Sequence, residues 1–370
     1  MAENRRLAHE MALWSRGRWQ VTAIAPRSYA GDLRRIDLEP IPGEAAQVLP
    51  LDMALDGRAH VMWYRGLRRA MRQGAEVVHA WEEPYVLAGL QIARAAPPDA
   101  KLVFATFQNL RKTYPWPFSA FERGSMNRAS GWVAFGHRVA EALAERDGYA
   151  GKPMRVIPPG VDLDRFHPDA EAGAALRDRL GWAGHADVVG YLGRFEVQKG
   201  VLDLIAALER VRGPWHALFV GGGSLQHELE VFAAAYPGRV HIENGVPHSD
   251  VPAWLNAMTI LCAPSRTTPI WKEQFGRMLI EAMACGVPAF ASESGEMPAV
   301  VHDAGRVLPE GDPEAWATAI DHHLRDPEML ATLSRRGLER AQTFFAWPVV
   351  ARRHIEFFDS LLDGGARGGW

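Results

Sequence analysis

Two carboxylates eight positions apart, Glu273 and Glu281, lie in the stretch WKEQFGRMLIEAMACGVP at 271–288. The apolar run at 259–265 predicts a strand, and Gly276 is expected to begin a helix. A helix N-terminus presents free N–H groups and the positive end of its dipole, which favours anion binding. The two acids would reach different parts of a ligand, and they suit the hydroxyls at both ends of a nucleotide sugar. The alternative is an acid at a helix start plus a second acid on a solvated face.

A second candidate group lies in YLGRFEVQKG at 191–200. A predicted strand ends in Gly193 and Arg194, and Lys199 stands at the start of the next helix. Arginine offers a planar fork and lysine a point charge, so the pair suits a diphosphate leaving group. The alternative is two solvated bases.

Two further turns in the second half carry weaker signals. Gly222 ends a predicted strand in FVGGGSLQHELE (219–230), which indicates either a phosphate-facing turn or merely a tight one. Val246 lies in ENGVPHSDVPAWL (243–255), where the backbone could face a flat base. A helix cap is the alternative for this segment.

Candidate acceptor-side residues follow predicted strands in the first half. The segment ATFQNLRKTYPWPFSAFER (105–123) mixes aromatic and basic residues, which suits a sugar or a phosphate-bearing ligand. A membrane-contact loop or a structural aromatic cluster is the alternative. Another strand ends in HAWEEPY (79–85), and a histidine opens the helix after 131–135, where packing or capping is the alternative. The residues concerned are Glu82, Gln108, Arg111, Lys112 and His137.

The composition limits the class of protein. A chain of 370 residues favours two domains, and 48% hydrophobic and 23% charged residues are typical of a globular protein. The formal net charge of −3 gives no support to nucleic-acid binding. Cys262 and Cys285 make neither a disulfide framework nor a metal site, so we expect buried thiols and no metal. No apolar run reaches the ~18 residues of a membrane span. Oligomeric state is left open.

Short β-branched runs alternate with amphipathic segments, which predicts an α/β protein with two doubly wound, Rossmann-like domains. We expect an N-terminal domain over 1–165, a C-terminal domain over 166–345 and a final helix over 346–363. Ligands of such domains bind at the carboxyl ends of the strands, so the expected site is the cleft between them. The predicted strands are 19–26, 75–81, 101–106, 131–135, 154–158, 187–195, 216–222, 239–244, 259–265 and 288–292. The predicted helices are 5–16, 57–72, 85–95, 137–146, 198–211, 224–235, 250–256 and 276–284.

The first half opens on a helical segment, NRRLAHEMALWSRGRW, rather than on a central strand with a glycine-rich turn. The N-terminal domain is therefore expected to lack that strand and loop. Unpaired strand edges inside a sheet are costly, so either the chain is truncated or another segment supplies the strand.

Four segments in order resemble the retaining glycosyltransferases of family 4, which have the GT-B fold. They are VIPPGVDLDRFHP, GYLGRFEVQKG, APSRTTPIWKEQFGRMLIEAMACGVPAFAS and GEMPAVVHDAGRVL, and the likeness is strongest from about 154 to 363. The resemblance implies transfer of a hexose from a UDP-, GDP- or ADP-sugar to a sugar, lipid-linked or small-molecule hydroxyl. It implies retention at the anomeric carbon without a bound metal or other cofactor. The two cysteines fit a reducing, cytoplasmic compartment, and peripheral contact at the inner membrane face is left open.

The resemblance also implies roles for residues. Arg194 and Lys199 would bind the diphosphate and stabilise its departure, Glu273 would hold the transferred sugar, and Glu281 would bind the ribose. The helix over 346–363 would cross back to the first domain. The other donor-side residues are Gly193, Gly222, Val246, Phe275, Gly276 and Arg277.

The chain departs from the family pattern at Gln108, where members often carry a histidine after Thr-Phe. Glutamine can hydrogen-bond a hydroxyl but cannot act as a base. Together with the missing first strand, this leaves a second interpretation open, a non-catalytic or partner-dependent nucleotide-sugar-binding protein. A dehydrogenase is disfavoured because no G-x-G-x-x-G opens the first domain.

Overall fold

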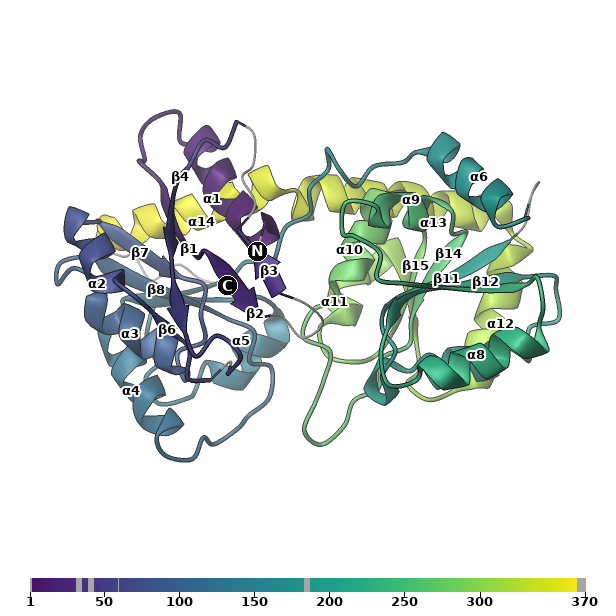
Figure 1. The fold of residues 1–370 in the computed structure, drawn as a ribbon, viewed down its shortest axis with the longest axis horizontal. Helices are drawn as coiled ribbons and strands as arrows, with labels where there is room; N and C mark the ends of the chain where they lie inside the picture. The colour runs from purple at the N-terminus through teal and green to yellow at the C-terminus, as the bar shows by residue number, and fades with distance from the viewer. Residues whose placement is uncertain (1, 31–34, 39–42, 59, 183–186, 365–370) are drawn as a thin grey trace. The chain divides into compact units, whose positions relative to one another are not determined.

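The computed structural model describes residues 2–30, 35–38, 43–58, 60–182 and 187–364 (Figure 1). The chain divides into two compact units. The N-terminal unit comprises Met1–Gly160 together with Trp347–Trp370, and the C-terminal unit comprises Val161–Ala346. The segment from 161 to 165 therefore belongs to the second unit.

The C-terminal unit is built on one six-stranded sheet in the order β13-β12-β11-β14-β15-β16, with every neighbouring pair parallel. The strands are β11 (Val188–Arg194), β12 (His216–Gly222), β13 (Val240–Asn244), β14 (Ile260–Ala263), β15 (Ala289–Ser292) and β16 (Gly305–Leu308). The helices are α6 (Ala170–Arg179), η2 (Val197–Lys199), α7 (Val201–Leu208), α8 (Gln226–Ala235), α9 (Val251–Asn256), α10 (Arg277–Ala284), α11 (Met297–Val301), η3 (His302–Ala304), α12 (Pro313–Leu324), α13 (Pro327–Arg340) and the π-helical turn η4 (Ala341–Phe345).

Side-chain alternation along the strands fills two cores, one on each face of this sheet. Val188 joins a core with residues of α9 and α10, whereas its neighbour Val189 joins a second core with residues of α7, α8 and α12. Figure 1 shows helices on both sides of the sheet. Strands buried on both faces read as continuous apolar runs, which explains why the sequence located them.

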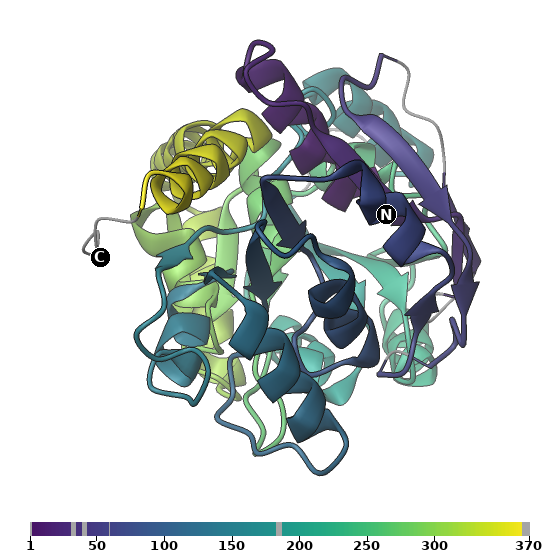
Figure 2. The same cartoon turned by 90° about the vertical axis from the view of Figure 1, so that its left-hand side faces the viewer.

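The N-terminal unit holds a four-stranded parallel sheet in the order β10-β9-β8-β7 and a separate parallel pair, β1 and β4 (Figure 2). Two antiparallel pairs, β2–β3 and β5–β6, complete its strands. The strands are β1 (Thr22–Pro26), β2 (Ser28–Ala30), β3 (Arg35–Asp37), β4 (Gln47–Leu51), β5 (Met53–Ala54), β6 (Trp63–Tyr64), β7 (Val77–Ala80), β8 (Lys101–Thr106), β9 (Gly131–Ala134) and β10 (Met154–Val156). The helices are α1 (Ala2–Trp14), α2 (Leu67–Ala70), η1 (Met71–Gln73), α3 (Leu87–Ala95), α4 (Phe118–Arg128), α5 (His137–Leu143) and α14 (Trp347–Leu362).

The β1–β4 pair and the four-stranded sheet share the same two apolar layers. Ile24 of β1 and Val78 of β7 pack against one core, while Val21 and Val77 pack against the other. No ladder of hydrogen bonds joins β1 to β7 in the described part of the chain. Among the described residues, no other segment supplies a strand between β1 and β7.

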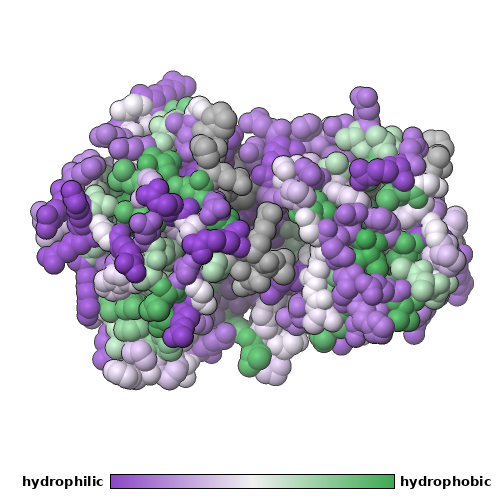
Figure 3. All heavy atoms as spheres, in the orientation of Figure 1, coloured by the Kyte–Doolittle hydropathy of each residue, from purple (hydrophilic) through white to green (hydrophobic). Residues whose placement is uncertain are grey.

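The helix α14 packs in the N-terminal unit, where its apolar face lies against α1 and β8. Gly160 lies close to the first residue of α14, Trp347. A Cβ atom at position 160 would lie 2.3 Å from the Trp347 ring. None of the helices in the described ranges is long and apolar enough to cross a membrane. The face in Figure 3 carries mostly hydrophilic side chains with hydrophobic ones interspersed, as is usual for a protein surface.

Some sequence-based assignments need correction. The helix predicted over 57–72 is wrong for most of its length, because β6 and a left-handed Gly66 (φ 79°) interrupt it and α2 begins only at Leu67. The strands β2 to β6 and the edge strand β16 were not predicted, since most of their residues are half-buried or exposed and they lack the continuous apolar run of a buried strand. Both cysteines are buried, as predicted.

Candidate functional site

Two charged side chains meet where parallel strands of the C-terminal unit end. β11 and β14 are neighbours in the sheet, so the loops after them leave the same edge. Lys199 lies in the loop after β11 and Glu273 in the loop after β14, and the Lys199 Nζ is 2.6 Å from the Glu273 Oε2. Their side chains are only 13% and 9% exposed. The structure thus brings together a lysine and an acid 74 positions apart.

Neighbouring residues complete the surroundings of this ion pair. The Ser265 hydroxyl donates to the Glu273 Oε2 at 3.1 Å. The Lys199 Nζ also lies over the Trp271 ring, 4.9 Å from its centroid. An ammonium has three N–H donors, so Lys199 retains donors for an anionic ligand while it contacts Glu273.

Two glycines allow the backbones around the pair to lie in direct contact. Gly200 (φ 70°) would place a Cβ 1.8 Å from the Pro264 carbonyl oxygen, and Gly295 (φ 57°) would place one 1.8 Å from the Glu273 carbonyl oxygen. Both positions combine a left-handed backbone with no room for a side chain. The positions of Lys199 and Glu273 are therefore fixed by close backbone packing.

Arg194 lies exposed at the end of β11, opposite Gly222 of β12. The Tyr191 hydroxyl donates to the Arg194 carbonyl at 2.7 Å. Burial raises the pKa of Tyr191, the charge of Glu273 raises it further, and the charge of Arg194 lowers it. The charges of both Glu273 and Arg194 therefore act on the Tyr191 hydroxyl at this edge of the sheet. The carbonyl of Gly193 lies against Gly221, where a Cβ atom would approach it to 1.8 Å.

The helix α10 begins beside this pair. Gly276 precedes it in a left-handed conformation (φ 82°), and Phe275 is buried against Phe345 with ring centroids 5.9 Å apart. The first residue of α10 is Arg277. Glu281, one turn further on, is 6% exposed, so it does not lie on a solvated face.

Glu281 faces the loop after β13. The His248 Nε2 lies 3.3 Å from its Oε1, and Val246 of the same loop packs against the core. Burial raises the pKa of Glu281, while the charges of Arg277 and Arg165 lower it. This carboxyl is thus a buried group beside the loop whose backbone, in one of the two interpretations of the sequence, faces a nucleotide base.

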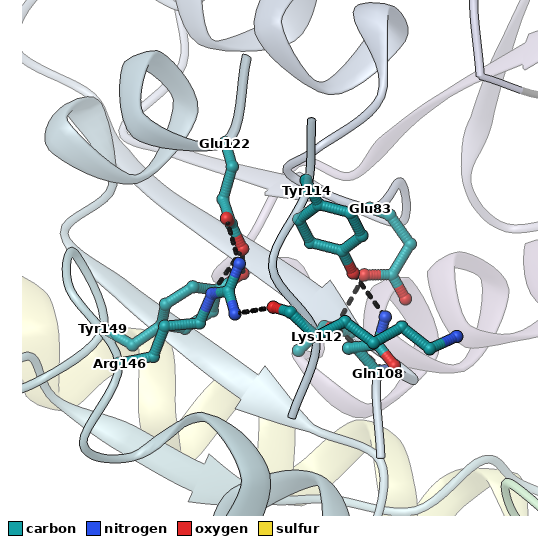
Figure 4. A network of polar contacts seen from close by, with 8 residues as sticks. Glu83, Gln108, Lys112, Tyr114, Glu122, Arg146 and Tyr149 are labelled. Atoms are coloured by element: carbon teal, nitrogen blue, oxygen red, sulfur yellow. Dashed lines mark hydrogen bonds and ion pairs between the residues drawn. The ribbon is translucent and has the colours of Figure 1, made fainter. Parts of the chain in front are cut away.

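The acceptor-side residues lie in the N-terminal unit. The Tyr64 hydroxyl donates to the Glu82 Oε1 at 2.6 Å, and the Gln108 Nε2 donates to the Tyr114 hydroxyl (Figure 4). Arg111 is exposed and contacts the Glu141 carbonyl at 3.4 Å.

Lys112 and His137 complete the predicted set. The Lys112 carbonyl accepts a hydrogen bond from Arg146, whose guanidinium also pairs with both oxygens of Glu122 (Figure 4). His137 is the exposed first residue of α5. These contacts do not gather the five side chains around one point. They place Glu82 and Gln108 in polar networks and leave Arg111 and His137 on the surface.

Sequence reasoning missed several residues that the structure places beside the predicted ones. Ser265, Trp271 and Gly295 surround the Lys199–Glu273 pair, and His248 contacts Glu281. Glu83 accepts hydrogen bonds from Thr106 and from the Phe107 N–H, and Figure 4 shows it beside Tyr114 and Gln108. The adjacent acids of HAWEEPY were visible in the sequence, but nothing in the pattern distinguished Glu83 from Glu82.

Two family descriptions match the chain, one in each half. "Glycosyltransferase Family 4" matches residues 5–165, and "Glycosyl transferases group 1" matches residues 186–326. No single description covers half of the chain, but together they follow its two units.

Curated relatives give the same indication. The chain is 31% identical to the lipopolysaccharide core biosynthesis mannosyltransferase LpsB of Rhizobium meliloti, over 65% of this chain and 72% of that protein. It is 33% identical to the D-inositol 3-phosphate glycosyltransferase of Xylanimonas cellulosilytica, over 61% of this chain and 56% of that protein. The chain spans about half the length of several curated relatives that it matches.

Solved structures share the fold. The structure of Anabaena Alr3699/HepE in complex with UDP and glucose superposes with a TM-score of 0.73 over 97% of both chains, at 18% identity. The predicted α/β class with two Rossmann-like domains of GT-B type is thereby confirmed.

Proposed function

Since the chain belongs to the group 1 glycosyl transferases, glycosyltransferase family 4, we propose that it transfers a hexose from a nucleotide-diphosphate sugar to a hydroxyl acceptor. The reaction would retain the configuration at the anomeric carbon and need no bound metal. The observation that carries the proposal is the buried contact between the Lys199 Nζ and the Glu273 Oε2 at the carboxyl ends of β11 and β14. Carboxyl ends of parallel strands are where ligands of doubly wound sheets bind.

The two members of this pair have complementary tasks. A diphosphate leaving group gains negative charge as the bond to the sugar breaks, and a preorganised cation stabilises that charge. Lys199 retains donors for this purpose, and Arg194 at the end of the same strand supplies a planar fork. Glu273 only accepts hydrogen bonds when ionised, so it suits the hydroxyls of the transferred hexose. Its contact with Lys199 keeps the ammonium in place before the donor arrives.

The start of α10 would bind other parts of the donor. The backbone N–H groups after Gly276 lie at a helix N-terminus, which favours phosphate oxygens. Glu281 would accept hydrogen bonds from the ribose hydroxyls, the loop of Val246 would face the base, and the turn at Gly222 would face a phosphate. UDP, GDP and ADP donors all remain candidates. The relatives include a D-inositol 3-phosphate glycosyltransferase and a lipopolysaccharide core biosynthesis mannosyltransferase, which makes a polyhydroxylated acceptor the first class to examine.

The proposal is tested by donor turnover in point variants. Lys199→Ala and Glu273→Gln should each lower kcat for transfer at least a hundredfold, because each removes a group that acts on the departing donor. UDP-, GDP- and ADP-glucose and -mannose serve as donors, with D-inositol 3-phosphate as the acceptor probe and donor hydrolysis as a second readout. Lys272→Ala is the matched control, since it removes a lysine one residue from Glu273.

Each outcome decides between named alternatives. Loss of turnover in the two variants but not in Lys272→Ala, with unchanged far-UV circular dichroism, supports the assignment. Unchanged turnover in both variants would remove the pair from the reaction. Nucleotide-sugar binding without hydrolysis or transfer in the unmodified protein would favour a non-catalytic binding protein instead.

A further inference from the structure

The carboxylate of Glu83 ties together the ends of two neighbouring strands in the N-terminal unit. β7 and β8 are parallel neighbours, so the loops after them leave the same edge of the sheet. Glu83 follows β7, and its Oε2 accepts a hydrogen bond from the Thr106 hydroxyl at 2.7 Å. Its Oε1 accepts one from the Phe107 N–H, also at 2.7 Å. Both oxygens of one carboxylate therefore hold the turn that follows β8.

The hydrogen bonds continue from this turn to Gln108. The Thr106 hydroxyl oxygen, which donates to Glu83, also accepts from the Gln108 N–H at 3.2 Å. The Gln108 side chain accepts from the Leu110 N–H at 3.2 Å and donates to the Tyr114 hydroxyl. These two bonds use one of its N–H groups and one of its carbonyl lone pairs. The amide keeps further donor and acceptor capacity in a fixed orientation.

A second contact joins the same two loops. Tyr85, two residues after Glu83, stacks on Tyr114 with ring centroids 4.2 Å apart and an angle of 15° between the planes. The Gln108 amide thus lies in a network anchored to the loop after β7 by a carboxylate and by a pair of rings.

We propose that Glu83 is a positioning residue for acceptor binding, because its ionised carboxylate fixes the Thr106–Gln108 turn so that the Gln108 amide meets a hydroxyl of the acceptor. This inference rests on the proposed function and deepens its acceptor side. Protonation of Glu83 replaces one acceptor oxygen by a donor, so the Thr106 hydroxyl proton loses its partner and the turn loses an anchor. Acceptor binding therefore weakens when Glu83 takes up a proton.

The surroundings bring that protonation into the physiological range. Desolvation raises the pKa of Glu83 to about 7, although the bonds from Thr106 and Phe107 favour the ionised form. The charges of Glu82 and Glu122 raise it further. The titratable groups near it from the packed elements are Glu82, Tyr85, Tyr114, Glu122, Arg146 and Tyr149.

The neighbouring groups have contacts of their own. Glu122 is paired with Arg146 at 2.6 Å, and burial raises the pKa values of Tyr85, Tyr114 and Tyr149. Glu82 accepts from the Tyr64 hydroxyl and is bonded away from the turn. Its pKa is also raised by burial, so the experiment needs a variant specific for Glu83.

The first experiment measures the KM for D-inositol 3-phosphate at pH 6 and pH 8 in the unmodified protein and in Glu83→Gln. From pH 6 to pH 8 the ionised fraction of a carboxyl group with a pKa near 7 rises from about 0.1 to about 0.9. The KM of Glu83→Gln should therefore exceed that of the unmodified protein about tenfold at pH 8 but only about twofold at pH 6. Titration of the probe's own phosphate is common to both proteins and cancels in this ratio.

Thr106 provides a matched pair of variants. Thr106→Val removes the hydroxyl and should raise the acceptor KM as Glu83→Gln does, while Thr106→Ser keeps the hydroxyl and should restore the unmodified value. The KM for the donor should stay constant in all of them, because the donor residues lie in the other unit. A KM ratio for Glu83→Gln that is the same at both pH values would overturn the proposal.

A second readout needs no acceptor. In amide NMR spectra, the Phe107 N–H resonance should shift between pH 6 and pH 8 with a midpoint near 7, and Glu83→Gln should abolish the shift. A Phe107 resonance that stays constant in the unmodified protein would contradict the inference. Absence of transfer with an intact Phe107 titration would instead count against the proposed function alone.

Discussion

Gly295 offers a sharp test of how the donor side is held, because its backbone lies against that of Glu273. A Cβ atom at this position would lie 1.8 Å from the Glu273 carbonyl oxygen, about 1.6 Å short of the 3.4 Å at which ordinary contact begins. The three heavy atoms nearest to this Cβ are all backbone atoms of Glu273, so no flexible side chain can turn away. Gly295→Ala must therefore displace Glu273, the residue that pairs with Lys199.

The magnitude follows from two separate terms. The left-handed backbone (φ 57°) costs an alanine about 1–2 kcal/mol of stability. The displacement acts on activity, since a shift of about 1 Å in a catalytic group lowers the rate by about a hundredfold. We expect kcat/KM for transfer to fall by roughly that factor, with a loss of stability of a few kcal/mol.

Gly238→Ala separates these two terms. Gly238 is also left-handed (φ 75°) and belongs to the same unit, but a Cβ atom there meets nothing within 4 Å. Gly238→Ala should lose about 1–2 kcal/mol in urea unfolding and keep kcat/KM within about twofold. The two variants are compared under conditions in which the same fraction of each is folded. A kcat/KM for Gly295→Ala equal to that of Gly238→Ala would then refute the reasoning.

Three further predictions concern other parts of the chain. Glu281→Gln should weaken UDP binding about tenfold or more in calorimetry, because it removes a charged acceptor; equal affinity would exclude a ribose contact. Gly160→Ala should lower the stability of the N-terminal unit by about 1–3 kcal/mol in thermal unfolding, because a Cβ atom would lie 2.3 Å from the Trp347 ring; an unchanged melting temperature would show that the ring moves freely. His354 is buried with its pKa lowered to about 4, so the unfolded chain takes up a proton near pH 6.5 that the folded chain does not. Stability should fall by up to about 3 kcal/mol between pH 6.5 and 4. His354→Phe should reduce this loss in urea unfolding, and an unaltered pH dependence would contradict the assignment.

The parallel sheets were predictable because their strands are buried on both faces. Runs such as HALFVGG (216–222) are continuous in apolar residues, and the structure places β12 at those bounds. The N-terminal half was less predictable. The strands β2 to β6 are short and half-exposed, so their composition does not differ from that of loops. A left-handed Gly66 decides where α2 begins, which a helical period cannot show.

The candidate site was predictable at the level of segments but not of partners. Lys199 and Glu273 are 74 positions apart, and their contact depends on which strands are neighbours in the sheet. The order β11-β14 is a property of the chain topology that spacing alone does not encode. The burial of Glu281 and its contact with His248 likewise arise from the packing of α10 beside the loop after β13.

The central claim, that the Lys199–Glu273 pair forms part of a nucleotide-sugar site, is tested most directly by calorimetry with UDP, GDP and ADP. The account predicts that one of the three binds with a sub-millimolar Kd and that Lys199→Ala weakens this binding at least tenfold, while Lys272→Ala leaves it unchanged. Binding that is equally strong in Lys199→Ala, or no binding of any of the three nucleotides, would contradict it.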